Sequence, residues 1–68
     1  MKIEYDPEAD AMYITVKEGE FSYNVVVDEN TILDFNKKGE LLGIEILFVK
    51  ERNPSFLKEL KEKKLIIA

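Results

Sequence analysis

The chain has 68 residues, of which 46% are hydrophobic and 35% are charged, and its formal net charge is −4. This composition predicts one small globular domain over residues 1–68, and the acidic balance disfavours nucleic acid as a partner. The chain contains no cysteine and no histidine, which excludes disulfides and thiolate metal sites and removes the commonest general base.

The first half of the chain has the pattern of β-strands. Residues 1–5 (MKIEY) and 11–17 (AMYITVK) alternate apolar and polar side chains, as in a strand with one buried face. Residues 23–28 (YNVVVD) are rich in β-branched side chains and predict a third strand. This strand continues or restarts at residues 31–35 after a bend or bulge.

Residues 36–40 (NKKGE) are the best turn signal in the chain. Asn36 suits the first position of a type I turn and Gly39 the left-handed position that follows it. This turn sets a register for the strands on either side, and it places Asp34 and Glu45 on opposite faces. The predicted partners across the two strands are Asn36–Glu40, Asp34–Leu42 and Thr31–Glu45.

The strand that returns from this turn, residues 41–49, is apolar on both faces except at Glu45, which predicts a central or sandwiched position. A helix is expected next, with Asn53 as its N-cap and Pro54 in its first turn. Its apolar stripe is Phe56, Leu57 and Leu60. The last four residues (LIIA) predict a short added strand or an anchor onto a neighbouring subunit.

These elements predict an α+β fold, an antiparallel β-meander of about four strands followed by one C-terminal helix. One helix covers one face of a sheet, so the second apolar face needs another cover. A single core of this size rarely supplies more than about 3–5 kcal/mol of stability. We therefore expect a homodimer or a higher homo-oligomer. The predicted interaction residues are Asp34, Glu45, Leu42, Ile44, Ile46 and Phe48.

Two motifs in this order resemble the domain of unknown function 2283 family, a group of small prokaryotic proteins. The first motif is YDPEADAMYI, residues 5–14, and the second is GELLGIEIL, residues 39–47. Met12 stands where the family usually has leucine. The resemblance covers residues 1 to about 49 and implies a fold but no activity, because the family has no established one.

Three acidic residues alternate in the first motif, Asp6, Glu8 and Asp10. Their spacing imitates the start of a calcium loop, but Ala11 and Lys17 stand where that loop needs glycine and glutamate. Asp6 instead suits a turn in which its carboxylate accepts backbone N–H groups two and three residues on, and Asp10 can act in the same way. No metal site is predicted, and weak cation binding by the three acids is the alternative.

An enzyme is the less favoured reading of this sequence. Asp34 and Glu45 on adjacent strands are the candidates for acid–base or Mg²⁺ chemistry, but the predicted register separates them. Ser22 and Ser55 have no histidine base. No catalytic residue and no cofactor is therefore predicted. The leading hypothesis is a self-associating interaction or accessory module; a divalent-metal-dependent enzyme and a small inhibitory partner of another protein are the alternatives.

The chain shows no signal-peptide pattern and no apolar run of the roughly 18 residues that a membrane helix needs. A cytoplasmic protein without membrane contact is expected. Charge is unevenly distributed, with −7 over residues 1–49 and +3 over residues 50–68. The basic segment can therefore lie against the acidic sheet of another copy, although charge alone does not establish this.

Overall fold

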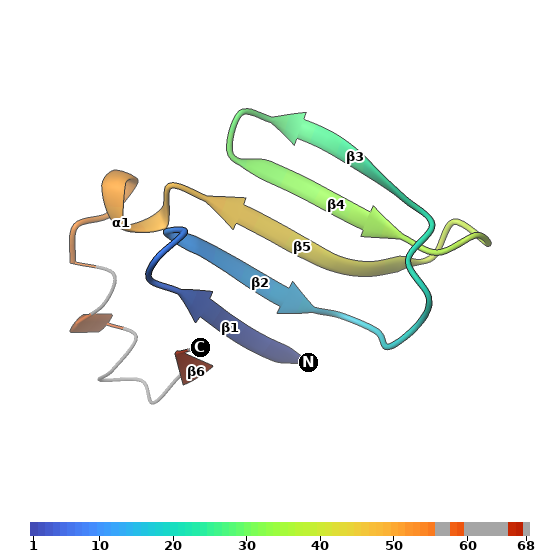
Figure 1. Cartoon of the computed structure of the whole chain (residues 1–68), viewed down its shortest axis with the longest axis horizontal. Coiled ribbons are helices and arrows are strands. Elements are labelled where there is room, and N and C mark those ends of the chain that lie inside the picture. Colours follow the sequence, from blue (N-terminus) through green and yellow to red (C-terminus); the bar gives the residue numbers. More distant parts are fainter. Residues whose placement is uncertain (56–57, 60–65, 68) are drawn as a thin grey trace.

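The computed structural model describes residues 1–55, 58–59 and 66–67. These residues form one sheet with the strand order β3-β4-β5-β2-β1-β6 (Figure 1). The strands are β1 (Lys2–Asp6), β2 (Ala11–Thr15), β3 (Tyr23–Asp28), β4 (Thr31–Phe35), β5 (Leu41–Leu47) and β6 (Ile66–Ile67), and the short helix α1 spans Val49–Arg52.

The sheet is built from two units of consecutive strands. A hairpin of β1 and β2 joins a three-strand meander of β3, β4 and β5, and the two units meet where β2 pairs with β5. The predicted α+β fold with an antiparallel sheet is confirmed, and β5 is the central strand that its apolar sequence predicts. Residues 31–35 restart as a separate strand. The final segment adds β6, which pairs in parallel with β1.

The tight connections have the predicted turn chemistry. Gly39 has a φ of 81° and its N–H donates to the carbonyl of Asn36 over 3.0 Å. The side chain of Asn36 accepts the N–H groups of Lys38 and Glu40, which locks the turn. At the β3–β4 bend, Asn30 N–H donates to Asp28 Oδ1 over 2.9 Å, and the ladder shifts register beside it.

The predicted register between β4 and β5 is wrong beyond the turn. Phe35 pairs with Leu41, but the next pair along the ladder is Asp34 with Gly43, so Leu42 is an extra residue in β5. This bulge shifts every later pair by one position, and Glu45 lies opposite Ile32 instead of Thr31. Asp34 and Glu45 therefore share a face of the sheet, which corrects their predicted separation.

Residues directly opposite one another on paired strands point to the same face, so the registers define two faces. We call one the aliphatic face; its central row is Ile3, Ile14, Ile44, Leu33 and Val25. We call the other the acidic face; it carries Glu4, Tyr13, Glu45, Ile32, Val26, Gly43 and Asp34.

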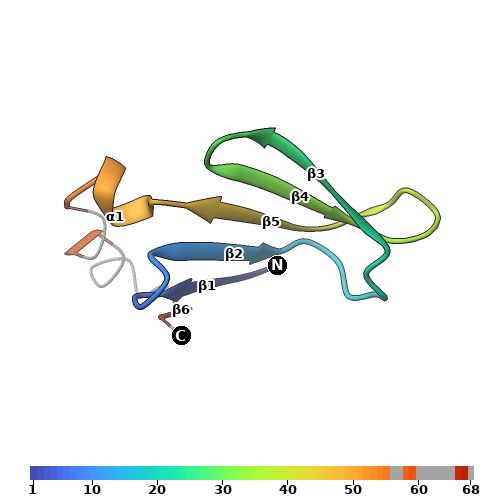
Figure 2. The ribbon, with the colours of Figure 1, turned by 45° about the horizontal axis from the view of Figure 1, so that its top comes forward.

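The core of the described residues is small and lies at one end of the aliphatic face. Tyr5 is 1% exposed and packs with Val49 of α1, with Met12 and Ile46 beside them. Figures 1 and 2 show a single-layered sheet with α1 at the end of β5, and no described helix crosses the middle of either face. Little of the sheet is covered by α1, because this helix has only four residues.

The predicted helix after Asn53 falls mostly outside the described residues. Lys58 and Glu59 are described and helical, and Glu59 N–H donates to the carbonyl of Ser55 over 3.1 Å, an (i, i−4) bond. Phe56, Leu57 and Leu60 are not described. Asn53 itself caps the C-terminus of α1, where its N–H donates to the carbonyl of Val49.

The left-handed backbone of Gly39 gives a first prediction. A Gly39→Ala variant should lose about 1–2 kcal/mol of stability, because an L side chain is strained at positive φ. Lys38→Ala is the matched control in the same turn and should be nearly neutral. Urea denaturation followed by circular dichroism measures both, and equal stabilities of the two variants would contradict the turn geometry.

Candidate functional site

The acidic turn of the first motif connects β1 and β2. Asp6 Oδ1 accepts the N–H groups of Glu8 and Ala9 over 3.0 and 3.4 Å, so the predicted role of Asp6 in shaping the turn is confirmed. The Glu8 side chain is exposed. The carboxylate of Asp6 is thus already used by the turn that it shapes.

Asp10 makes long-range contacts instead of the predicted local ones. Its Oδ1 accepts the Tyr5 hydroxyl and the Lys50 N–H, both over 2.7 Å, and its Oδ2 accepts the Glu51 N–H over 3.2 Å. These N–H groups lie at the start of α1, and the Asp10 carbonyl also accepts the N–H of Val49. Asp10 therefore caps a helix about 40 residues away and closes the core beside Tyr5.

We call the contacts of Asp10 with Tyr5 and with the start of α1 the Asp10 junction. They shift the pKa of both Tyr5 and Asp10. The hydrogen bond to Asp10, followed by burial, raises the pKa of Tyr5 to about 12. The same hydrogen bond, with those from the backbone of Lys50 and Glu51, lowers the pKa of Asp10 below its ordinary value. Asp10 is consequently a structural anion at neutral pH.

A second group of polar side chains lies at the middle of the acidic face. It consists of Tyr13 from β2, Asp34 from β4 and Glu45 from β5. The ring of Tyr13 lies across Gly43, since a Cβ on Gly43 would be 2.1 Å from its hydroxyl oxygen. Gly43 therefore leaves the space through which Tyr13 reaches toward Asp34.

Asp34 is the buried member of this group, with 7% of its surface exposed. Burial and a hydrogen bond to Asp34 raise the pKa of Tyr13, while burial and the charge of Asp34 raise the pKa of Glu45. Oδ1 of Asp34 is buried without a hydrogen-bond partner. Such an atom costs about 1–3 kcal/mol unless a donor reaches it.

A hollow of about 430 Å³ opens beside this group on the acidic face. Its acidic lining residues are Glu4, Asp6 and Glu45, and Ala9, Ala11 and the Tyr13 ring form apolar walls. Lys2 lies 3.6 Å from the carboxylate of Glu4. Both partners of that ion pair are more than a third exposed, so solvent screens it.

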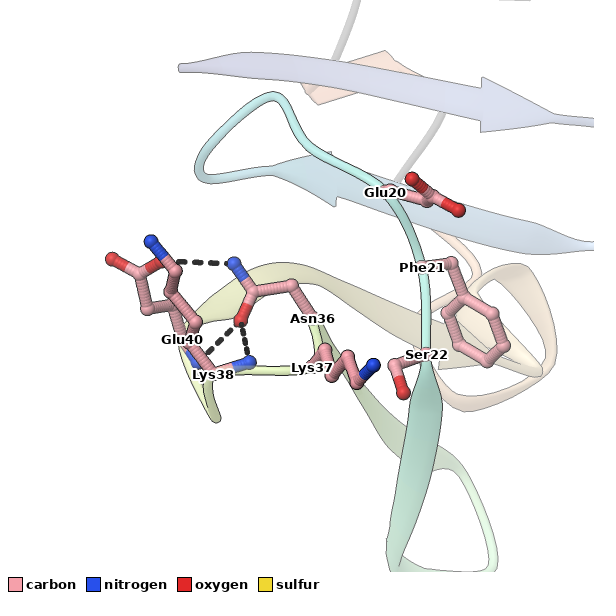
Figure 3. A pocket seen from close by; sticks show the side chains of 7 residues that line it. All are labelled: Glu20, Phe21, Ser22, Asn36, Lys37, Lys38 and Glu40. Carbon is pink, nitrogen blue, oxygen red and sulfur yellow. Dashed lines mark hydrogen bonds between the residues drawn. The ribbon is translucent and has the colours of Figure 1, made fainter.

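A second hollow, of about 420 Å³, lies between the loop before β3 and the 36–40 turn (Figure 3). Ser22 lines it together with Lys37, Lys38 and the exposed ring of Phe21. Figure 3 shows the Asn36 amide directed into the turn, where it binds Glu40. The hydrogen bonds in this hollow join Asn36 to Lys38 and Glu40, so these polar groups stabilise the turn.

Two negative findings apply to residues 1–55, 58–59 and 66–67 alone. No group of three acidic, cysteine or histidine side chains gathers there in a way that could hold a metal ion. Asp6, Glu8 and Asp10, the candidates for weak cation binding, are no exception. In the same residues, no helix has the length and apolar character to cross a membrane.

The Tyr13–Asp34–Glu45 group is the feature that the sequence analysis missed. Its members are distant in sequence, and the bulge at Leu42 reverses the face assigned to one of them. Gly43 is the signal that could have revealed it. A glycine in an otherwise apolar central strand indicates a place where another group approaches the backbone closely.

Comparison with protein families gives a match over most of the chain. The family model described as "Protein of unknown function (DUF2283)" matches residues 2–50, so the resemblance of the two motifs is confirmed. The curated proteins and the solved structures contain no match to this chain.

The Asp10 junction predicts a difference between two otherwise similar substitutions. Asp10→Asn should lower the melting temperature clearly, because an amide cannot accept at both oxygens as the carboxylate does. Asp6→Asn should be nearly neutral, since the amide oxygen can still accept from the turn. Thermal melts at neutral pH compare the two variants, and a larger loss for Asp6→Asn would refute the assignment.

The same junction predicts a pH dependence. The hydrogen bonds from Tyr5, Lys50 and Glu51 hold the pKa of folded Asp10 below that of an unfolded aspartate. Its stabilisation is therefore present above the unfolded pKa and is lost as the pH falls through the folded pKa. Between about pH 5 and about pH 2 the wild-type chain should therefore lose more stability than Asp10→Asn. Urea titrations across this range measure the difference, and parallel curves would contradict the ionised junction.

The contact between Gly43 and Tyr13 predicts a packing penalty. Gly43→Ala should cost about 1–3 kcal/mol because the new methyl group overlaps the Tyr13 ring. Gly19→Ala is the control: its Cβ would lie 2.8 Å from the flexible end of Leu42, which can move aside. Urea denaturation should show the larger loss for Gly43→Ala; the reverse order would contradict the ring position.

Proposed function

This chain belongs to the DUF2283 family, and since that family has no assigned activity, we propose from the structure that the protein is a self-associating interaction module. Its aliphatic face packs against the same face of a second copy. The observation that supports this proposal is the central row of that face, which contains no charged residue and is covered by no described helix.

The exposure of this row shows where cover is lacking. Ile3, Ile14, Ile44 and Leu33 are only partly buried, and Val25 is 45% exposed. Residues in the middle of a sheet stay partly exposed when no second layer packs on that face. Leu42 is buried, and Ile46, which is partly buried, packs on the core beside Tyr5.

The area of the face is suited to a dimer of moderate affinity. Five strands spaced about 4.8 Å apart, each with about five residues, give a flat footprint of roughly 400 Å². Soluble monomers rarely expose larger apolar patches, and standard interfaces bury about 800 Å² on each partner. The footprint is below that standard, so we expect a dimer that dissociates readily on dilution.

A second copy fits this face better than an unrelated charged partner. A row of aliphatic side chains is complementary to itself, and a two-fold axis through Ile44 would pair each row with its own image. Of the residues predicted to interact, Ile44 and Ile46 lie on this face and Phe48 is exposed at the end of β5. Asp34 and Glu45 lie on the opposite face and do not belong to this interface.

Sedimentation velocity over a dilution series tests the proposal. The chain should sediment as a dimer at high micromolar concentration and dissociate on dilution. A stable, folded monomer at millimolar concentration would overturn the proposal.

Two neighbouring residues of β3 provide matched variants. Val25 points to the aliphatic face and Val26, which is 67% exposed, points to the acidic face. Val25→Lys should weaken the dimer at least about tenfold, because a charge would be desolvated in the interface. Val26→Lys adds the same charge to the same strand and should leave the dimer intact. Dissociation by Val26→Lys alone would place the interface on the acidic face.

A further inference from the structure

The outer edge of the sheet is a feature that association through the aliphatic face does not use. Among the described residues, β3 pairs with β4 alone, and Figure 1 shows it at the border of the sheet. The opposite edge is closed in part by the two residues of β6, which pair with β1. In an edge strand, the backbone N–H and C=O groups of every second residue point away from the sheet. The open edge at β3 therefore fits one kind of partner, a further extended strand.

β3 lacks most of the features that keep edge strands from pairing. Its sequence, YNVVVD, contains no lysine and no proline, and its charged residue, Asp28, stands at the end. The ladder with β4 is regular from Tyr23 to Val26, and the shift between Val26 and Asp28 affects only the last part. All six residues are exposed, and the exposed fraction of Val27 is 57%. An open edge that is rich in β-branched residues favours pairing with another strand.

We propose that β3 pairs in antiparallel orientation with β3 of a second copy, so that two chains form one continuous sheet. The two-fold axis of this edge pair is perpendicular to the sheet and passes beside Val25. Val25 then lies opposite the same residue of the second copy, and Asn24 lies opposite Val26. This register centres the edge pair on the exposed side chains of Val25 and Val26, which lose contact with water there.

The strand itself and the area of the aliphatic face favour a second copy as the occupant of this edge. Residues 24–26 carry no charge, so the strand meets its own image without like charges opposite each other. Opposite residues point to the same face of a sheet, so the aliphatic faces of both chains lie on the same side. Val25 ends the central row of the aliphatic face, and the two rows therefore join end to end. The joined face has twice the footprint of one chain, roughly 800 Å², which is the standard area for one partner.

Stacking of two such paired sheets rests on the proposed function, whereas the edge pairing itself does not. At millimolar concentration the wild-type chain should therefore form assemblies larger than the face-to-face dimer. Val26→Lys places a charge in the middle of the edge, which disfavours strand pairing, and should stop assembly at that dimer. Sedimentation velocity compares the two chains, and equal assembly sizes would overturn the edge pairing.

Cross-linking through single cysteines in the full chain tests the register, because the chain has no cysteine of its own. Val25→Cys should form a disulfide between two chains when oxidised glutathione is added, since opposite Cβ atoms of paired strands lie about 4.5–5.5 Å apart. Asn24→Cys and Val26→Cys should not cross-link to themselves, because each is displaced along the strand from its own image. A mixture of these two variants should cross-link, since each faces the other.

The rates of cross-linking separate a defined edge pair from random collision. Val25→Cys should form its disulfide at least about tenfold faster than either neighbour alone, because paired thiols have a high effective concentration. Equal rates for the three variants would overturn the proposal. Faster self-cross-linking of Asn24→Cys or Val26→Cys would overturn the register centred on Val25. Circular dichroism of the reduced variants verifies folding, and the mixture of the two neighbours is the second measurement if Val25→Cys does not fold.

A variant of the aliphatic face distinguishes the two interfaces. Ile3 lies on that face in β1, which three strands separate from β3. Ile3→Lys should abolish the face-to-face dimer, yet the Val25→Cys disulfide should still form in this background. A disulfide that disappears with the dimer would assign the Val25 contact to the aliphatic face and overturn the edge pairing. Ile3→Asn is the second variant if Ile3→Lys does not fold.

A strand from another protein is the alternative occupant of this edge. A synthetic peptide of residues 22–28 (SYNVVVD) serves as a free extended strand, and amide shifts of β3 in nuclear magnetic resonance spectra report its binding. If the second copy is the occupant, the peptide should compete with it and slow formation of the Val25→Cys disulfide. Binding of the peptide without any disulfide between chains would assign the edge to a segment of another protein and overturn the proposal.

Discussion

One extra residue in the central strand decides the character of both faces of this protein. Leu42 bulges out of the β4–β5 ladder, and the pairs beyond it are displaced by one position. Because side chains alternate along a strand, this displacement places Asp34 beside Glu45 instead of across the sheet from it. It also leaves Leu33 and Ile44 paired on the aliphatic face, which is thereby free of charge along its central row.

The acidic residues of the first motif have different physical roles despite their regular spacing. Asp6 closes the turn in which it stands, whereas Asp10 links that turn to Tyr5 and to the first N–H groups of α1. The first motif therefore joins both ends of the family region, residues 2–50, around the buried tyrosine. Its chemistry supports the fold, and the acidic face holds the less explained polar groups.

The two faces offer different kinds of recognition on a sheet of a single layer. The aliphatic face can gain stability by excluding water, a term that is non-directional and proportional to area. The acidic face offers few contacts, but hydrogen bonds to its carboxylates are directional. Since the two faces are separate, a molecule that binds one face leaves the other accessible.

The amino-acid sequence by itself determined the strands, the turn at Asn36 and Gly39, the central place of β5 and the role of Asp6. Each of these depends on local periodicity or on the backbone preference of one or two residues. The family is likewise visible in two contiguous motifs. The sequence around Asp10 does not indicate that this residue caps α1, because its partners there are about 40 residues away.

Only the tertiary structure decided the register beyond the bulge and the meeting of Tyr13, Asp34 and Glu45. A bulge leaves almost no local signal, since the extra leucine suits a strand as well as its neighbours do. Which carboxylates come together depends on pairing among three strands, and pairing is a property of the assembled sheet. The need for glycine at position 43 is explained only by the Tyr13 ring that lies against it.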